Sequence, residues 1–404
     1  MDLYFCALAF KTMQKPTIRF DDTATAFAFR TDKELKKSHF VFNTMRHPWM
    51  VKLGIVATKI VLALRLPFKG IIRTTLFNQF CGGESIDGSF QTVKKLGDYH
   101  VHTILDYSVE GASIEEVFDH TRDEILHICS TAKGNPHIPF CVVKMTGLGS
   151  AAIMEKKQSG AVLSDEEKAA LDRMAARAKA IAQAAKENDL VFMIDAEETW
   201  IQDVIDNVVY DLMRQFNTER PLVYNTYQLY RHDALANMQK AFAQLTGEGC
   251  YFGAKLVRGA YMEKERERAE EMGYPSPIQP DKAATDRDYD EAVRFCIEHI
   301  DRMGVCVGSH NEKSNQLMVD LLTEKGLSKD NPLVYSAQLL GMSDHISFNL
   351  SKEGYNVAKY VPYGPIEKVM PYLFRRAEEN TSIAGQTGRE LILIKKEIQR
   401  RKLA

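Results

Sequence analysis

Several absences in the sequence narrow the class of protein. Its seven cysteines are scattered over 404 residues and never stand in a C-x-x-C pair, so neither a disulfide framework nor a zinc knuckle is indicated. This pattern is typical of a protein kept in a reducing compartment. The 52 basic and 54 acidic side chains nearly cancel, so we expect no nucleic-acid partner. No low-complexity tract is present, and the composition is that of a globular protein.

Long hydrophobic runs and the common catalytic motifs are also missing. The most apolar stretch, residues 53–66, contains Lys59 and Arg65 and is shorter than the ~20 residues of a membrane span. Residues 1–10 lack the basic segment and cleavage site of a signal peptide, so we expect no secretory signal there. No nucleophile elbow, Walker loop or H-E-x-x-H sequence occurs. We therefore expect neither a catalytic serine nor a metal site.

The first part of the chain is expected to be helical. Apolar residues at spacings of three and four predict helices over residues 33–45, 48–65 and 67–80, after a loose arm that extends to about residue 31. From residue 99 onward, short apolar runs alternate with amphipathic helices. The clearest helix covers residues 165–187, behind a capping box of Ser164 and Glu167. We therefore expect an N-terminal arm with helices over residues 1–98 and a catalytic barrel over residues 99–404.

Eight β-branched runs indicate eight strands that alternate with helices. They cover residues 101–106, 140–146, 190–196, 222–227, 254–259, 305–310, 333–339 and 357–362. This number predicts an α/β protein with a closed (βα)8 barrel of the TIM type, and an open doubly wound sheet is the alternative. A charged insertion over residues 261–281 follows the fifth run. We interpret it as a lid, because barrels place their active sites on this face; a plain surface insertion is the alternative.

Polar residues stand at the carboxyl ends of these runs, where the strands of a barrel converge on one mouth. They are Asp106, Lys144, Asp195, Gln228, Lys255, Arg258, His310, Asn311, Gln338 and Tyr360. Buried charges are costly unless they are paired or hold an anion. An internal ion pair, such as Lys144 with Asp195, would explain any one position, whereas the whole set favours a ligand site. Lys144 could also form a Schiff base, as in barrel aldolases, and such a lyase is the alternative activity.

Two adjacent arginines, Arg375 and Arg376, lie on the helix that is predicted after the eighth run. Glu379 follows them by four and three residues, so a salt-bridged helix face is one interpretation. Adjacent arginines near a barrel mouth also suit bidentate capture of a carboxylate or phosphate. The spacing alone leaves both interpretations open.

Five motifs follow one another along the chain. They are Lys255-Leu-Val-Arg-Gly-Ala-Tyr261, Gly308-Ser-His-Asn311, Gln338-Leu-Leu-Gly-Met342, Lys359-Tyr-Val-Pro-Tyr-Gly364 and Tyr372-Leu-Phe-Arg-Arg-Ala-Glu-Glu-Asn380. In this order and spacing the chain resembles the flavin-dependent proline dehydrogenases over roughly residues 135–390, in their eukaryotic-like, single-function branch. The resemblance implies a distorted barrel that holds FAD at its mouth and oxidises L-proline to Δ1-pyrroline-5-carboxylate. Electrons would then pass to a membrane quinone.

The resemblance also implies roles for individual residues. Lys144, Asp195 and Arg258 are the expected catalytic residues. The expected substrate-binding residues are Lys144, Tyr261, Leu339, Tyr360, Arg375, Arg376 and Glu379, with the two arginines on the proline carboxylate. FAD would contact Asp195, Gln228, Lys255, Val257, Arg258, Gly259, Thr285, His310, Asn311, Gln338 and Glu379. Lys255 departs from the arginine that many relatives have at this position.

A further segment predicts contact with a membrane surface. Residues 51–68 are apolar, with Lys52, Lys59 and Arg65 spaced along them, as in a helix that lies on a bilayer. A helix packed on the barrel is the alternative. Surface contact would suit a quinone acceptor that is dissolved in lipid. We therefore expect a cytoplasmic protein at the periphery of the inner membrane, with the mitochondrial matrix side as the alternative.

Overall fold

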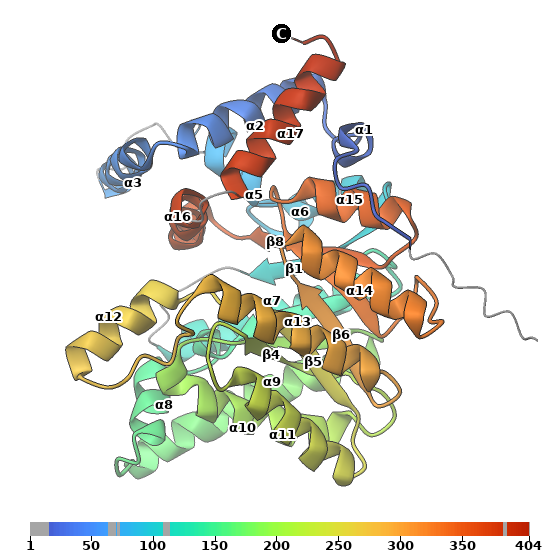
Figure 1. Cartoon of the computed structure of the whole chain (residues 1–404). Helices are drawn as coiled ribbons and strands as arrows, with labels where there is room; N and C mark the ends of the chain where they lie inside the picture. Colours follow the sequence, from blue (N-terminus) through green and yellow to red (C-terminus); the bar gives the residue numbers. More distant parts are fainter. Residues whose placement is uncertain (1–15, 64–69, 71–72, 108–113, 383–385, 404) are drawn as a thin grey trace, which may run out of the picture.

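Eight parallel strands close into a barrel, each strand pairing with the next along the chain and β8 pairing with β1 (Figure 1). The computed structural model describes residues 16–63, 70, 73–107, 114–382 and 386–403. The strands are β1 (Val101–Tyr107), β2 (Phe140–Lys144), β3 (Val191–Asp195), β4 (Val223–Gln228), β5 (Phe252–Val257), β6 (Met303–Gly308), β7 (Val334–Leu339) and β8 (Val357–Tyr363). The predicted closed barrel is confirmed, and the open sheet is excluded.

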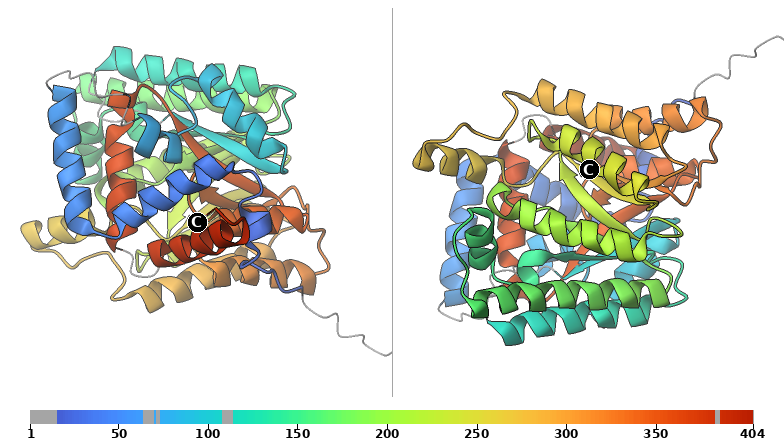
Figure 2. Two further views of the ribbon diagram at one scale, coloured as in Figure 1. Left: turned by 90° about the horizontal axis from the view of Figure 1, so that it is seen from above. Right: turned by 90° about the horizontal axis from the view of Figure 1, so that it is seen from below.

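Helices surround the barrel on its outer side (Figure 2). They are α7 (Glu115–Ala132), a 3-10 turn (Met145–Gly147), α8 (Ala151–Gln158), α9 (Asp165–Glu187), α10 (Thr199–Phe216), α11 (Ala234–Gly247), α12 (Met262–Met272), α13 (Lys282–Glu298), α14 (Glu312–Glu324), α15 (Asp344–Lys352) and α16 (Ile366–Ser382). The predicted capping box of α9 is confirmed. Glu167 N donates to Ser164 Oγ at 3.1 Å, and Ser164 N donates to the Glu167 carboxylate at 2.7 Å.

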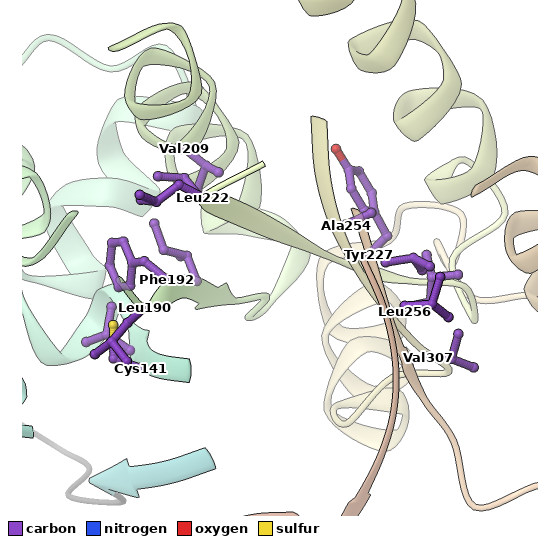
Figure 3. Close-up of a cluster of buried hydrophobic side chains, with 14 of the residues drawn as sticks. Cys141, Leu190, Phe192, Val209, Leu222, Tyr227, Ala254, Leu256 and Val307 are labelled. Carbon is purple, nitrogen blue, oxygen red and sulfur yellow. The ribbon is translucent and has the colours of Figure 1, made fainter. Parts of the chain in front are cut away.

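Two apolar layers follow from the alternation of side chains along the strands. Outward-facing residues such as Cys141 and Phe192 pack against the helices, as Figure 3 shows for one part of this layer. Inward-facing residues, including Met193 and Tyr224, form a second cluster inside the barrel. A Cβ atom at Gly304 would lie 1.9 Å from the Tyr224 hydroxyl, so this tyrosine needs a glycine beside it. The barrel interior is therefore a packed core that supports the mouth above it.

The helices at the two ends of the chain pack together on one side of the barrel (Figure 1). They are α1 (Thr23–Ala26), α2 (Asp32–Met45), α3 (Pro48–Ala63), a π-helical turn (Arg73–Phe77), α5 (Asn78–Phe80), α6 (Ile86–Gly97) and α17 (Gln386–Arg400). Phe42, Phe80, Leu373 and Leu391 share one buried apolar cluster. This cluster contains residues from both sides of the predicted domain boundary at residue 98. The boundary itself stays a prediction.

The expectation of a loose N-terminal arm is wrong for residues 16–31. Ile18, Phe20 and Phe27 are buried, and Ile18 N donates to Gln316 Oε1 on α14 at 2.9 Å. The apolar residues of this segment follow no helical period, because contacts with distant parts of the chain bury them. The predicted helix over residues 67–80 lies partly outside the described residues, and its described end is the π-helical turn followed by α5.

The charged insertion over residues 261–281 contains a helix where the sequence led us to expect a long loop. This helix, α12, ends at Gly273, which has a φ of 71° and forms a left-handed cap. Glu265 on α12 is buried, and its carboxylate accepts hydrogen bonds from Thr199 N and Oγ1 at 2.7 and 2.6 Å. The helix is therefore anchored at the start of α10, and its action as a lid stays a prediction.

The α3 helix carries a row of exposed apolar side chains. Trp49, Leu53 and Val56 are more than half exposed, whereas Val51 is buried. None of the described helices is long and apolar enough to cross a membrane.

Candidate active site

Inward-facing residues at the carboxyl ends of the strands bring four predicted site residues into contact. The β2–β3 register places Lys144 beside Asp195, and Lys144 Nζ lies 3.2 Å from Asp195 Oδ2 and 3.9 Å from Asp106 Oδ2. Lys255 Nζ contacts the other oxygen, Oδ1, of Asp195 and donates to the Tyr360 hydroxyl at 2.6 Å. This hydroxyl in turn donates to Asp195 Oδ1 at 3.2 Å. One carboxylate therefore holds two lysines and a tyrosine at the mouth.

The charges of this group depend on one another. Burial by itself would raise the pKa of Asp195, but Lys255 and Lys144 outweigh it and hold this pKa below its usual value. The ion pair that we weighed for Lys144 is thus present. A Schiff base requires an amine that is free to attack a carbonyl, whereas Asp195 holds the Lys144 Nζ atom, so this geometry argues against the lyase alternative.

Arg258 lies just beyond the end of β5 and joins three neighbouring elements. Its Nε donates to Asp286 on α13 at 2.7 Å, while Nη1 and Nη2 donate to Ser309 Oγ and Ser314 Oγ at 2.8 and 3.0 Å. The guanidinium carbon lies 4.3 Å from the centroid of the Tyr289 ring. These contacts fix the plane of the guanidinium group and involve three of its five N–H groups.

His310 is a neutral side chain at the end of β6. Burial lowers the pKa of His310 to about 3, and neighbouring cations, Arg376 among them, act in the same direction. The Nδ1 atom forms a hydrogen bond with Ser343 Oγ at 2.9 Å. Gln338 Nε2 donates to Ser309 O at 3.0 Å, which ties the end of β7 to the loop after β6. Neutral donors and acceptors therefore lie among the cations on this side of the mouth.

Glu197 is a buried site residue that the sequence analysis missed. Its carboxylate accepts from Thr146 N at 2.9 Å and from Thr146 Oγ1 at 2.5 Å, and burial raises its pKa to about 7. The Glu197 carbonyl accepts from Gln228 Nε2 at 2.7 Å, and Gln228 Oε1 accepts from Ala260 N at 3.2 Å. One chain of hydrogen bonds thus connects the end of β4 with the loops that follow β2, β3 and β5. The only sign of Glu197 in the sequence was its position, as a second acidic residue two places after Asp195.

The two arginines of α16 lie on the same side of the molecule as this mouth. Arg376 is buried, with its guanidinium carbon 5.2 Å from the Tyr372 ring centroid, and Arg375 is partly buried. Burial raises the pKa of Tyr261, and a nearby carboxylate adds to this effect, while Lys144 and Arg375 oppose it. These charges therefore lie within electrostatic reach of the Tyr261 ring. The Glu379 side chain lies outside the described part of the structure, so the salt-bridged alternative stays open.

The remaining predicted residues lie near the same end of the barrel. Leu339 pairs with Tyr360 across β7 and β8, Val257 pairs with Gln228 across β5 and β4, Gly259 follows Arg258, Thr285 is buried on α13, and Asn311 caps α14. Within the described ranges, no group of three or more histidine, cysteine or acidic side chains could hold a metal ion.

The fold and the site together define a (βα)8 barrel with a buried, charged mouth at the carboxyl ends of its strands. In such barrels this is the end at which ligands bind and reactions occur. The particular arrangement here, several cations around few carboxylates with tyrosines between them, suits a ligand that carries negative charge.

Comparison with known proteins gives the family. Residues 89–389 match the proline dehydrogenase family, and the chain belongs to that family. It is 43% identical to human "Proline dehydrogenase 1, mitochondrial" over 240 residues, covering 59% of this chain and 40% of the human one. It is 30% identical to the "Hydroxyproline dehydrogenase" of Xenopus laevis over 413 residues, covering 93% and 88% of the two chains.

A solved structure shows the same fold at lower sequence identity. Proline utilization A from Bdellovibrio bacteriovorus, described as inactivated by N-propargylglycine, superimposes with a TM-score of 0.70 at 19% identity. The match covers 92% of this chain and 40% of that one. The chain thus spans about two fifths of the length of both the human relative and this bacterial protein.

Proposed function

We propose that this protein oxidises L-proline to Δ1-pyrroline-5-carboxylate with FAD as its cofactor, the first step of proline catabolism. The observation that carries the proposal is the hydrogen-bonded group of Lys144, Asp195, Lys255 and Tyr360 in a chain of the proline dehydrogenase family. Proline is a zwitterion, so its site needs cations for the carboxylate and closely packed side chains around the ring. The residues proposed below would supply both.

We assign the substrate carboxylate to the two arginines of α16. Arg375 and Arg376 would each direct a planar guanidinium group at it, and Lys144 would add a third positive charge. Tyr261 and Leu339 would then form walls of the ring site, since one lies near these charges and the other is the last residue of β7. Hydride loss requires that the amine of proline is neutral. This amine would face the side of the site that these residues do not line.

Tyr360 would form a further wall of the ring site beside Leu339, with which it pairs across β7 and β8. Its hydroxyl is already used by Lys255 and Asp195, so the phenol ring is held in one orientation. A hydroxyl group on carbon 4 of the substrate would find no free partner at Tyr360. We therefore propose proline as the substrate in preference to 4-hydroxyproline, although one relative is named for hydroxyproline.

The residues of the mouth fit the chemistry of FAD. The pyrophosphate needs cations and the isoalloxazine edge needs hydrogen-bond donors, and Arg258, Lys255 and Gln228 supply both kinds of group. Gly259 has a φ of 141°, and a Cβ atom there would lie 2.5 Å from the Tyr230 ring, so only glycine fits at this turn after β5. The other proposed FAD contacts are Asp195, Val257, Thr285, His310, Asn311, Gln338 and Glu379. FAD, when bound, supplies the acceptor for the hydride from the ring carbon next to nitrogen.

The catalytic residues of the chain would act by position and charge. Asp195 pairs with Lys144 and Lys255 and fixes where their ammonium groups lie. Arg258 would stabilise negative charge that develops on the reduced cofactor, because its plane is already set by Asp286. The α12 helix would exclude water as a lid over the mouth.

We further propose that electrons pass to a membrane quinone and that α3 contacts the bilayer. Exposed Trp49, Leu53 and Val56 with the neighbouring Lys52 have the composition of an interfacial helix. The location would be the cytoplasmic surface of an inner membrane, or the matrix side in a mitochondrion, as the names of several relatives suggest. Flotation with anionic liposomes tests this contact: we expect binding at low salt, with loss of binding in Leu53→Glu. No binding at low salt would leave α3 with a packing role only.

The absorption spectrum of the purified protein tests the main proposal. We expect flavin bands in the visible range, which L-proline bleaches under anaerobic conditions. A colourless protein that FAD does not reconstitute would overturn the proposal. Borohydride trapping of a carbonyl substrate on Lys144 would instead support the lyase alternative.

A further inference from the structure

The loop that connects β7 to α15 has an unusual backbone at the edge of the mouth. It begins with Leu339, a proposed substrate wall, and ends at Asp344, the first residue of α15. Gly341 has a φ of 78°, and Ser343 has a φ of 51° and a ψ of 40°. A side chain other than glycine adopts this left-handed conformation only where its surroundings hold it there. The neighbours of the loop must therefore fix its shape.

One of these neighbours is a buried group of charges. Asp344 Oδ1 lies 3.0 Å from Lys359 Nζ, and Asp344 Oδ2 accepts from Arg30 Nη2 and Nε at 2.7 and 3.0 Å. The three side chains are 4%, 0% and 11% exposed. Burial by itself would raise the pKa of Asp344, but Lys359 and Arg30 hold it at about 2, so the carboxylate is charged. Lys359 faces away from the barrel interior, because alternate residues of β8 such as Tyr360 point inward.

The same arginine reaches the middle of the loop through two neutral side chains. Arg30 Nη1 donates to Ser38 Oγ at 3.0 Å, and Ser38 Oγ donates to Gln79 Oε1 at 2.9 Å. Gln79 Nε2 then donates to Gly341 O at 2.9 Å. A Cβ atom at Gly341 would lie 2.0 Å from Gln79 O, so α5 packs directly on the loop. Residues from the N-terminal helices thus hold the loop at two points.

The C-terminal helix holds it at a third point. Glu390 on α17 is buried, and its carboxylate accepts a hydrogen bond from Ser343 N. The Ser343 hydroxyl forms the 2.9 Å hydrogen bond with His310, which is one of the proposed FAD contacts. A path of direct contacts therefore runs from the helices at both ends of the chain to the cofactor side of the mouth.

The type of interaction indicates what this path does. A buried ion pair contributes little to stability compared with apolar side chains of the same size, because both charges lose their hydration. It does impose one geometry, since a misplaced partner leaves a buried charge unpaired. We propose that Arg30, Asp344, Lys359 and Glu390 are positioning residues that set the β7–α15 loop, and through Ser343 the His310 ring, for FAD. This inference rests on the function proposed above and assigns a role to the helices at the two ends of the chain.

Titration of FAD into the apoprotein, followed by flavin fluorescence quenching, tests the proposal. Arg30→Met should raise the Kd for FAD about tenfold or more, and Arg30→Lys should recover part of the loss. The matched control is Arg177→Met, since Arg177 is also shielded from solvent, at 5% exposure, and donates to Asp119 at 2.9 Å between α9 and α7, away from the β7–α15 loop. This control should lose thermal stability but keep its Kd for FAD.

A second pair of variants keeps the test decisive if Arg30→Met does not fold. Glu390→Gln retains an acceptor for Ser343 N and should bind FAD like the unchanged protein, whereas Glu390→Ala should bind it several times more weakly. Equal FAD binding by Glu390→Ala, or equal weakening in Arg177→Met and Arg30→Met, would overturn the inference. An unchanged protein that binds no FAD would overturn the proposed function and this inference together.

Discussion

Removal of the negative charge at the centre of the mouth gives the sharpest test of the site. Asp195→Asn keeps the shape of the side chain but leaves two ammonium groups, the buried one of Lys255 and the partly buried one of Lys144, without their shared carboxylate. Loss of one partner of a buried ion pair costs about 3–5 kcal/mol of stability. Lys255→Met should cost less, because Asp195 still pairs with Lys144. We expect the double variant to be about 1.5–3 kcal/mol more stable than the sum of the two single losses.

The assay is urea unfolding of the four proteins in saturating FAD, with two spectroscopic probes that must give the same transition. Each protein is also assayed for kcat and KM with proline. For Asp195→Asn, the loss in kcat/KM, expressed as a free energy, should exceed the loss in the free energy of unfolding. The lowered pKa of Asp195 gives a second signature. The stability that its charge contributes is present above about pH 4 and is lost as the pH falls through the lowered pKa. The free energy of unfolding of Asp195→Asn should therefore change less with pH in this range than that of the unchanged protein. Additive losses within about 0.5 kcal/mol would refute the interaction on which the site is built.

Three further changes test other parts of the molecule. Arg376→Met should raise KM for proline and lower kcat/KM by one to two decades while FAD stays bound, because one charge-assisted pair contributes about 1.5–3 kcal/mol. A normal KM, together with normal binding of cyclic carboxylate inhibitors, would leave the arginines a structural role only. The efficiency on 4-hydroxyproline should be one to two decades below that on proline, since its hydroxyl is unpaired against Tyr360, and equal efficiencies would contradict this placement. The raised pKa of Glu197 means that the native protein binds more protons than the unfolded chain between about pH 4.5 and 7, so its stability falls over this interval as the pH rises. The stability of Glu197→Gln relative to the unchanged protein should therefore rise by up to about 3 kcal/mol between pH 5 and pH 8, as measured by thermal unfolding at both pH values. A stability difference that is the same at both pH values would refute the raised pKa of Glu197.

The strands could be predicted from the sequence because each is a short apolar run between helices of clear period. The same patterns revealed Lys144 and Asp195, since charged residues at the ends of apolar runs need partners. Glu197 and Ser343 could not be found in this way. Glu197 acts through loops that only the closed barrel brings together, and the left-handed backbone of Ser343 has no signature in its residue type. Residues 16–31 were missed for a related reason, because their burial depends on helices nearly 300 residues away.

The contact between α2 and α17 has a consequence for synthesis of the chain. These two helices are among the most closely packed pairs in the molecule, yet more than 300 residues separate them in sequence. A ribosome releases α2 long before α17, so the part of the apolar side of α2 that packs on α17 has no partner during most of translation. Pairings across such a separation form slowly, because the intervening chain must be ordered first. The nascent protein is thus expected to expose this surface to chaperones, and closure of the two helices should be among its last folding events.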